Sequence, residues 1–156
     1  MKKTALTSVA VLAGIFGLTT AEWTGSKEIA ERGGTMTEPT FGVSVTTDKA
    51  INAAGENIVI ELTVFNRAAE DLTFDFRNAQ HYDFIIEDAE GTVVWQWAEG
   101  RMFAQVLGEE TLGPGREEVV YTETYAGPLP PGAYEITGAL ISSNRPLSAS
   151  LTITIE

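Results

Sequence analysis

The sequence predicts an all-β protein in which about eight short antiparallel strands form two packed sheets. After Phe41, apolar and polar residues alternate with a period of two, which is the pattern of strands with one buried face. Short clusters of Gly, Pro, Asn and Asp separate these runs and favour turns. No segment after Phe41 has a helical period of useful length. One-sided strands need a second sheet to cover them, so the expected architecture is an immunoglobulin-like β-sandwich.

The strand pattern appears in eight runs along the chain, each with alternating apolar residues. These runs are Phe41–Thr46, Ile58–Val64, Leu72–Phe76, Tyr82–Glu87, Thr92–Trp97, Glu117–Tyr125, Tyr134–Leu140 and Ser150–Ile155. Between two of them, Asp88–Gly91 suits a tight hairpin because Gly91 can supply the positive φ that closes it. Tyr134 follows a Pro-Gly turn, which is the placement of a tyrosine corner. We expect its hydroxyl to bond to the main chain, with a ligand contact as the alternative.

Two shorter segments precede the predicted sandwich. Lys2 and Lys3 are followed by a 14-residue uncharged apolar run, Ala5–Leu18, and then by small residues. This layout predicts a secretory signal in residues 1–21, and the run is shorter than the roughly 20 residues of a stable membrane-spanning helix. An uncleaved N-terminal anchor is the alternative. Residues 22–40 read as a linker and residues 41–156 as the domain, so we expect a secreted or cell-envelope protein.

The charge of the chain restricts its partners. It contains 10 basic and 22 acidic residues, with a formal net charge of −12. Lys2 and Lys3 belong to the N-terminal segment, which leaves eight basic against 22 acidic residues and a net charge of −14 for the remainder. Nucleic acids and anionic membrane surfaces select positive patches, so we expect neither as a partner. Membrane contact would occur only through an uncleaved N-terminal segment. The charge favours solubility, or steering toward a basic partner.

The sequence offers little for catalysis or metal binding. It has no Cys, and His81 is its only histidine. No G-x-S-x-G motif places a serine nucleophile, and a hydrogen-bonded structural or surface role is the simpler interpretation of His81. A single His without Cys argues against zinc, and the residues after Asp88 lack the later acids of a calcium loop. We therefore expect a protein that is not an enzyme and has no cofactor or metal.

Trp95 and Trp97 are separated by one residue, so they lie on the same face of one strand. Core packing is the simpler explanation of such a pair. The alternative is an aromatic shelf for a protein partner or a sugar, because Trp contributes a large contact area at interfaces.

Aromatic, Gly and Pro residues form a spaced series between Phe41 and Leu140. After Asn66, the series contains Phe74, Phe76, Gln80, Tyr82, Asp83, Phe84, Asp88, Gly91, Trp95, Trp97, Phe103, Gln105, Pro131, Gly132 and Tyr134. In order and spacing it resembles the BsuPI-type intracellular proteinase inhibitors. The resemblance implies a β-sandwich that binds serine proteases, with subtilisin-like enzymes as the candidates.

An inhibitor of this kind would present a loop to the protease cleft, and a rigid loop binds at a lower ordering cost. The first candidate is the connection Ala98–Gly115, which carries the apolar residues Met102, Phe103 and Leu107. The alternative is that Phe103 and Leu107 fold back and pack into the core. The second candidate is Ser142–Leu147, in which Arg145 precedes a proline.

These patterns together predict an exported, non-catalytic protein-binding domain, and the resemblance to the BsuPI family implies that it acts as a protease inhibitor. The alternative is a non-inhibitory extracellular or envelope β-sandwich for assembly, adhesion or glycan contact.

Overall fold

The structure is a computed structural model that describes residues 22–24, 39–115 and 117–156. The regular elements of these residues are all β-strands. They are β1 (Glu22–Thr24), β2 (Phe41–Thr47), β3 (Ile51–Asn52), β4 (Ile58–Asn66), β5 (Leu72–Phe76), β6 (Tyr82–Asp88), β7 (Val93–Gln96), β8 (Gly108–Leu112), β9 (Glu117–Tyr125), β10 (Gly132–Leu140) and β11 (Leu147–Ile155). In this part of the chain we find no apolar helix of bilayer-spanning length. The predicted signal segment, residues 1–21, and residues 25–38 of the predicted linker lie outside the described residues.

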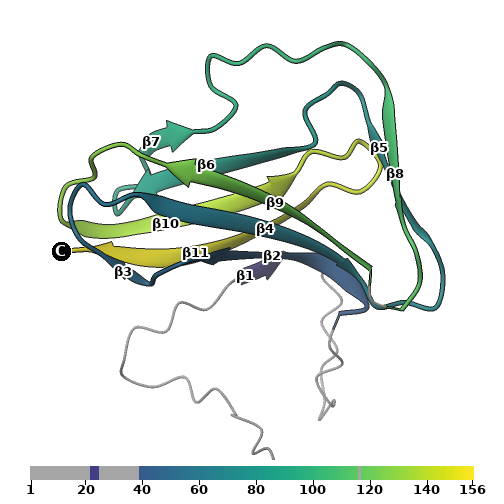
Figure 1. Cartoon of the computed structure of the whole chain (residues 1–156), viewed down its shortest axis with the longest axis horizontal. Helices are drawn as coiled ribbons and strands as arrows, with labels where there is room; N and C mark the ends of the chain where they lie inside the picture. Colours follow the sequence, from purple (N-terminus) through teal and green to yellow (C-terminus); the bar gives the residue numbers. More distant parts are fainter. Residues whose placement is uncertain (1–21, 25–38, 116) are drawn as a thin grey trace, which may run out of the picture.

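Two sheets form the layers of a sandwich (Figure 1). The larger sheet has the order β1-β11-β10-β6-β7, and β3 pairs with the end of β11. The smaller sheet has the order β2-β4-β9. Neighbouring strands in these two paths are antiparallel, whereas β3 runs parallel to β11. The prediction of an all-β protein built from antiparallel sheets is therefore confirmed.

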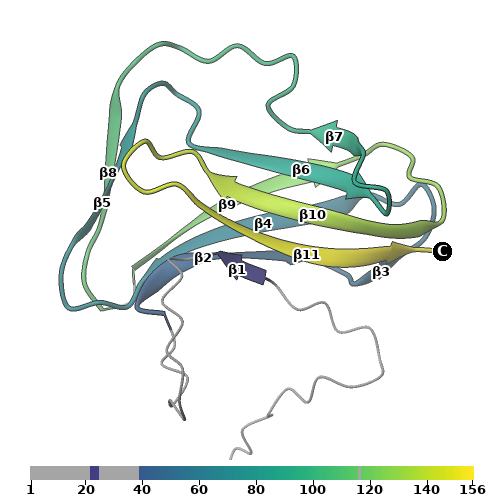
Figure 2. The ribbon, with the colours of Figure 1, turned by 180° about the vertical axis from the view of Figure 1, so that it is seen from behind.

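A two-stranded ribbon of β5 and β8 crosses one end of the sandwich (Figure 2). The side chain of Asn66, the last residue of β4, holds the base of this ribbon. Its amide nitrogen donates to the carbonyls of Glu70, Leu112 and Gly113 at 2.9, 3.0 and 3.0 Å, and its oxygen accepts from the amide of Ala68 at 3.0 Å. Asn66 is fully buried, so these bonds satisfy an amide that would otherwise be costly to remove from water.

The core lies between the two sheets and follows from the period-two alternation of the sequence. The inward residues of β4, for example, are Ile58, Ile60, Leu62 and Val64, all buried. At Gly138 the two sheets approach each other closely. A Cβ atom at this position would lie 3.0 Å from Leu62 Cδ1 and 3.3 Å from Val45 Cγ2, both in the opposite sheet. Glycine at this position lets the layers approach closely.

Two turns adopt the conformations expected from their sequences. Gly91 has a φ of 79°, and its amide donates to the carbonyl of Asp88 at 3.0 Å. The Asp88 carboxylate also accepts from the amide of Thr92 at 2.8 Å. The hydroxyl of Tyr134 donates to the carbonyl of Pro130 at 2.9 Å, so the tyrosine corner is confirmed as a structural contact.

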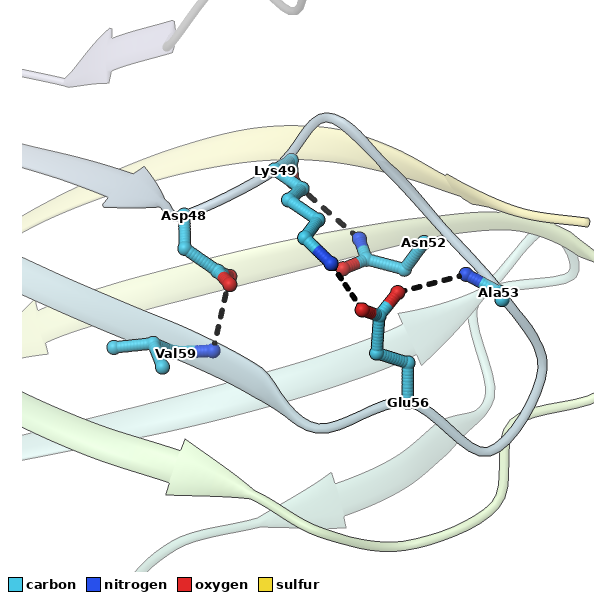
Figure 3. Close-up of polar contacts among 6 residues, drawn as sticks. All are labelled: Asp48, Lys49, Asn52, Ala53, Glu56 and Val59. Carbon is cyan, nitrogen blue, oxygen red and sulfur yellow. Dashed lines mark hydrogen bonds and ion pairs between the residues drawn. The ribbon is translucent and has the colours of Figure 1, made fainter.

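The connection between β2 and β4 folds against the end of β11 (Figure 3). Lys49 and Glu56 form an ion pair across it, and the Glu56 carboxylate also accepts from the amide of Ala53 at 3.1 Å. The hydrogen bond with Glu56 raises the pKa of Lys49 and lowers that of Glu56. Asp48 accepts from the amide of Val59 at 3.2 Å. These bonds join the two ends of the connection.

An aromatic pair bridges the two sheets on the side where β6 faces β9. The rings of Tyr82 and Tyr121 stack with centroids 4.5 Å apart. Their hydroxyls donate to carboxylates, Tyr82 to Glu123 at 2.5 Å and Tyr121 to Glu110 at 2.8 Å. Burial, and then the bond to Glu123, raise the pKa of Tyr82 to about 12. Burial and the bond to Glu110 raise the pKa of Tyr121 as well.

Three strands differ from the eight that the sequence predicts. β1 and β3 are only three and two residues long, too short to show a period, and β1 lies in the segment expected to be a linker. β8 contains Glu109, Glu110 and Thr111, and Leu112 is its one buried residue. β8 pairs with β5 in a separate two-stranded sheet, and its more buried positions are Gly108, Glu110 and Leu112, so the sequence shows no apolar alternation there.

We expect Gly138→Ala to destabilise the domain by about 1–3 kcal/mol, because the added methyl group would overpack the contact with Leu62 and Val45 of the opposite sheet. Urea unfolding followed by Trp fluorescence measures the change. Ala139→Val, on the opposite face of the same strand, is the matched control and should change the stability by less than about 0.5 kcal/mol. Equal effects of the two substitutions would contradict the close approach at Gly138.

The raised pKa values of Tyr82 and Tyr121 predict a loss of stability at alkaline pH. A phenol that stays neutral more easily in the folded state stabilises the fold fully below its ordinary pKa of about 10. This contribution is lost as the pH rises to the folded-state pKa of Tyr82, about 12. We expect the free energy of unfolding to fall across this window, and to fall less steeply in Tyr82→Phe.

Urea unfolding at a series of pH values measures these free energies. Lysines also titrate at alkaline pH, but their contribution cancels when Tyr82→Phe is compared with wild type. Identical slopes for the two proteins would contradict the assignment.

Candidate protein-binding loop

The connection between β7 and β8 contains eleven residues, 97–107, and we call it the 97–107 loop. Among residues 39–156 it is the longest connection between two strands. It arches over the sandwich from β7 to the β5–β8 ribbon (Figure 1). Three of its apolar side chains are exposed to solvent: Met102 by 98%, Leu107 by 83% and Val106 by 62%. Such exposure of apolar side chains on one segment is typical of a surface that contacts another molecule.

A buried carboxylate holds the start of the loop. Asp83, in β6, accepts from the amide of Ala98 at 3.0 Å and from the side-chain amide of Gln96 at 2.6 Å. It also accepts from the amide of Phe84 at 2.9 Å. Bonds to an ionised acceptor are stronger than neutral ones, and Asp83 is only 4% exposed. The backbone is therefore fixed where it leaves β7.

The next part of the loop packs against the indole of Trp97. It stacks on Tyr82 at 4.5 Å and contacts Phe103 at 5.7 Å between ring centroids. The guanidinium of Arg101 lies 4.3 Å from the centre of the same indole, and its Nε donates to the Trp97 carbonyl at 2.7 Å. Gly100, with a φ of 71°, allows the chain to turn back so that Arg101 reaches the ring.

The end of the loop is attached to the connection between β5 and β6. The carbonyl of Ala104 accepts from the amide of Ala79 at 2.9 Å. In β8, the Glu110 carboxylate lies 3.0 Å from Nδ1 of His81 and accepts from Tyr121. The His81 ring stacks on Phe76 at 4.0 Å. His81 thus has the hydrogen-bonded role that its sequence context suggested, and it braces the return of the chain into β8.

The predicted binding residues differ in how far their side chains are exposed. Met102 and Leu107 are exposed on the loop. Trp97 is buried and Phe103 half-buried, which places both in the core or against it. Trp95 is also half-buried and lies edge-on to Tyr125, with centroids 5.2 Å apart. Within the free domain, the two tryptophans therefore pack against neighbours.

Arg145 belongs to a different part of the surface. It lies in the turn between β10 and β11, where its guanidinium is 5.8 Å from the ring of Phe41. The same turn bonds to β5, because the carbonyl of Asp75 accepts from the amide of Ser143 at 2.8 Å. Arg145 is exposed, but these contacts do not join it to the 97–107 loop.

The predicted limits of the loop were wrong at its C-terminal end. The sequence predicted one connection from Ala98 to Gly115, whereas Gly108–Leu112 is strand β8. The sequence also did not identify Asp83, Arg101 or Val106 as parts of the site. Asp83 stands between two aromatic residues in a strand, so it looked like an ordinary outward-facing acid. It is paired with Gln96 at the end of β7 and with Ala98 at the start of the loop.

Charge and metal chemistry contribute little at this loop. Its charged residues are Glu99 and Arg101, which are opposite in sign, so recognition by the loop would rest on apolar contact. Across the described part of the chain, no cluster of three or more His, Asp or Glu side chains is placed to hold a metal ion.

Comparison with solved structures places the chain among known β folds. It is similar to Spo0M, the sporulation control protein from Bacillus subtilis, with a TM-score of 0.53 and 16% sequence identity. The match covers 76% of this chain and 50% of that chain, so this protein spans half the length of Spo0M. The likeness concerns the fold alone. A CARDB domain of the PF1109 protein from Pyrococcus furiosus matches with a TM-score of 0.45 and 15% identity, over 83% of this chain and 100% of that chain. No curated protein sequence is significantly similar to this chain.

A family profile gives the more specific result. The BsuPI profile, described as intracellular proteinase inhibitor, matches residues 45–145. This range contains β3 to β10 and the entire 97–107 loop. It also contains Tyr82, Asp83 and Trp97, which carry the sequence resemblance and which form the base of the loop. The chain therefore belongs to the BsuPI family of intracellular proteinase inhibitors.

Proposed function

We propose that this protein is an exported, non-catalytic domain that binds serine proteases of the subtilisin-like type and inhibits them through the 97–107 loop. The family supports a protease as the class of partner. The observation that carries the proposal is a long loop with exposed apolar side chains and a base held by buried contacts. A protease cleft binds an extended segment, so a loop that is already held open is suited to enter it.

The fixed base supports inhibition by lowering the cost of binding. A loop that must be ordered on association loses about 0.5–1.5 kcal/mol for each mobile side chain that becomes fixed. Here Asp83 anchors the backbone at Ala98, and Trp97 holds the side chains of Arg101 and Phe103. These groups need no further ordering when a protease approaches. The absence of cysteine in the chain means that packing and hydrogen bonds do the work of a disulfide.

Export is part of this proposal and rests on the sequence of residues 1–21. The family description names intracellular inhibitors, whereas two lysines followed by a 14-residue apolar run are typical of a secretory signal. The two are compatible if the family fold acts outside the cytoplasm in this case. Mass spectrometry of the protein from its native cells reads the N-terminal residue directly. A chain that begins near Glu22 supports export, and a soluble cytoplasmic chain that begins at Met1 contradicts it.

We expect the purified protein, with the N-terminus it carries in cells, to inhibit subtilisin in a titration of peptidase activity. The double variant Met102→Asp/Leu107→Asp should weaken inhibition by at least about 100-fold, because carboxylates would replace the two most exposed apolar side chains of the loop and central contacts of about 2–4 kcal/mol would be lost. The measurement is the inhibition constant from the residual activity at each inhibitor concentration.

Ile51→Asp is the matched control for this titration. Ile51 is 58% exposed on β3, away from the loop, so a carboxylate there should leave the inhibition constant unchanged. Circular dichroism confirms that the variants fold. Complete lack of inhibition by folded wild-type protein at micromolar concentration would remove the inhibitor function and favour a non-inhibitory envelope module.

We expect Asp83→Asn to loosen the base of the loop. The substitution keeps the shape of the side chain but replaces one acceptor with an amide group that donates toward Gln96. It should destabilise the domain by about 1–3 kcal/mol and speed the dissociation of a bound protease. Hydrogen exchange of the Ala98 amide is the direct measurement, compared with the amide of Ile136 in the core strand β10.

Asp71→Asn is the control for the change in charge, because Asp71 is an exposed acid outside the strands. It should leave both amides and the dissociation rate unchanged. Unaltered exchange of the Ala98 amide in Asp83→Asn would show that the carboxylate does not hold the loop.

A further inference from the structure

Within the 97–107 loop, Met102 occupies a position unlike that of any neighbour. The residues on both sides of it, Arg101 and Phe103, are attached to the same indole, that of Trp97. Because both neighbours turn inward to one ring, the side chain between them must point away from the domain. Met102 is 98% exposed, the highest value among the exposed large apolar residues of the described chain.

The main chain of Met102 is also available for binding. No hydrogen bond within the described residues uses its amide or its carbonyl, whereas the amide of Arg101 donates to Ala98 and the carbonyl of Phe103 accepts from Gln105. A segment that binds in a cleft as an added strand needs unpaired backbone groups at its centre. Met102 therefore combines unpaired backbone groups with a side chain that points away from the domain.

The other residues of the loop fit this role less well. Phe103 is half-buried against Trp97, and Arg101 is held over the indole, so neither side chain is free to enter a pocket. Leu107 is exposed but immediately precedes Gly108, whose backbone pairs with Phe76 in the ribbon. A protease that reached Leu107 would meet the ribbon beside it.

From this geometry we propose that Met102 is the specificity-determining residue of the loop and fills the primary pocket of a serine protease whose pocket is deep and apolar. This inference rests on the proposed inhibitor function. An unbranched thioether side chain is flexible and apolar, so it suits such a pocket. A protease with an acidic pocket would instead select a basic side chain, and the only basic side chain of the loop is Arg101, which is committed to Trp97.

The test is a specificity switch, measured as inhibition constants of the purified protein against subtilisin, chymotrypsin and trypsin. Chymotrypsin has an apolar primary pocket and trypsin has an acidic one. We expect wild type to inhibit enzymes with an apolar pocket and to inhibit trypsin at least about 100-fold less well. Met102→Lys should reverse this preference, whereas Met102→Leu should retain the wild-type preference within about 10-fold.

Leu107→Lys and Arg101→Gln are the matched variants. Leu107→Lys places the same new charge at another exposed apolar position of the loop, and it should leave trypsin inhibition as weak as in wild type. Arg101→Gln should weaken binding to all inhibited enzymes without changing their order, because it releases one of the two side chains that project Met102. A switch toward trypsin in Leu107→Lys, or its absence in Met102→Lys, would overturn the assignment of Met102.

The outcomes separate this inference from the function on which it rests. Wild-type protein that inhibits none of the three enzymes, together with a Met102→Lys variant that remains inactive against trypsin, overturns both. Strong inhibition of subtilisin by wild type with no dependence on residue 102 overturns only the role of Met102. Mass spectrometry after long incubation adds a second readout, because slow cleavage between Met102 and Phe103 supports the assignment and cleavage after Leu107 contradicts it.

Discussion

The stacking of Trp97 on Tyr82 is the contact on which the arrangement of the candidate site depends. Tyr82 in turn stacks on Tyr121 of the opposite sheet, so a continuous row of rings joins the loop to both layers of the sandwich. The side chains of Phe103 and Arg101 contact Trp97, the ring at the loop end of this row. An aromatic stack in a buried setting is worth about 0.5–1.5 kcal/mol beyond its buried area. These contacts attach Trp97, Arg101 and Phe103 of the loop to the domain.

Three consecutive residues of β6 illustrate how one strand serves fold and site together. Phe84 is fully buried in the core, and Tyr82 forms the bridge between the sheets. Asp83 lies between them in sequence and therefore faces the opposite side of the strand. There it meets Gln96 and Ala98 and holds the start of the loop. The side chains on one face of β6 thus stabilise the core, and Asp83 on the other face positions the loop.

Much of the fold followed from the sequence because its signals are local. The hairpin at Gly91 and the corner at Tyr134 were predictable from residues within four positions of each. β8 was not predictable in this way. It is a strand because it pairs with β5, about 35 residues earlier in the chain, and its glutamates interrupt any apolar alternation in the sequence. The same reason hid the role of Asp83, which is paired with residues 13 and 15 positions away.

The sequence by itself determined that the chain is all-β, where most strands lie, and that its aromatic series is that of a known family. These properties reside in the period of alternation, in turn residues and in spacing, none of which requires knowledge of contacts. Only the tertiary structure decided which of the apolar loop residues face solvent. Phe103 turns inward and Met102 outward because Trp97 offers one ring to both neighbours of Met102. That choice depends on packing between segments, so it cannot be read from the order of the residues.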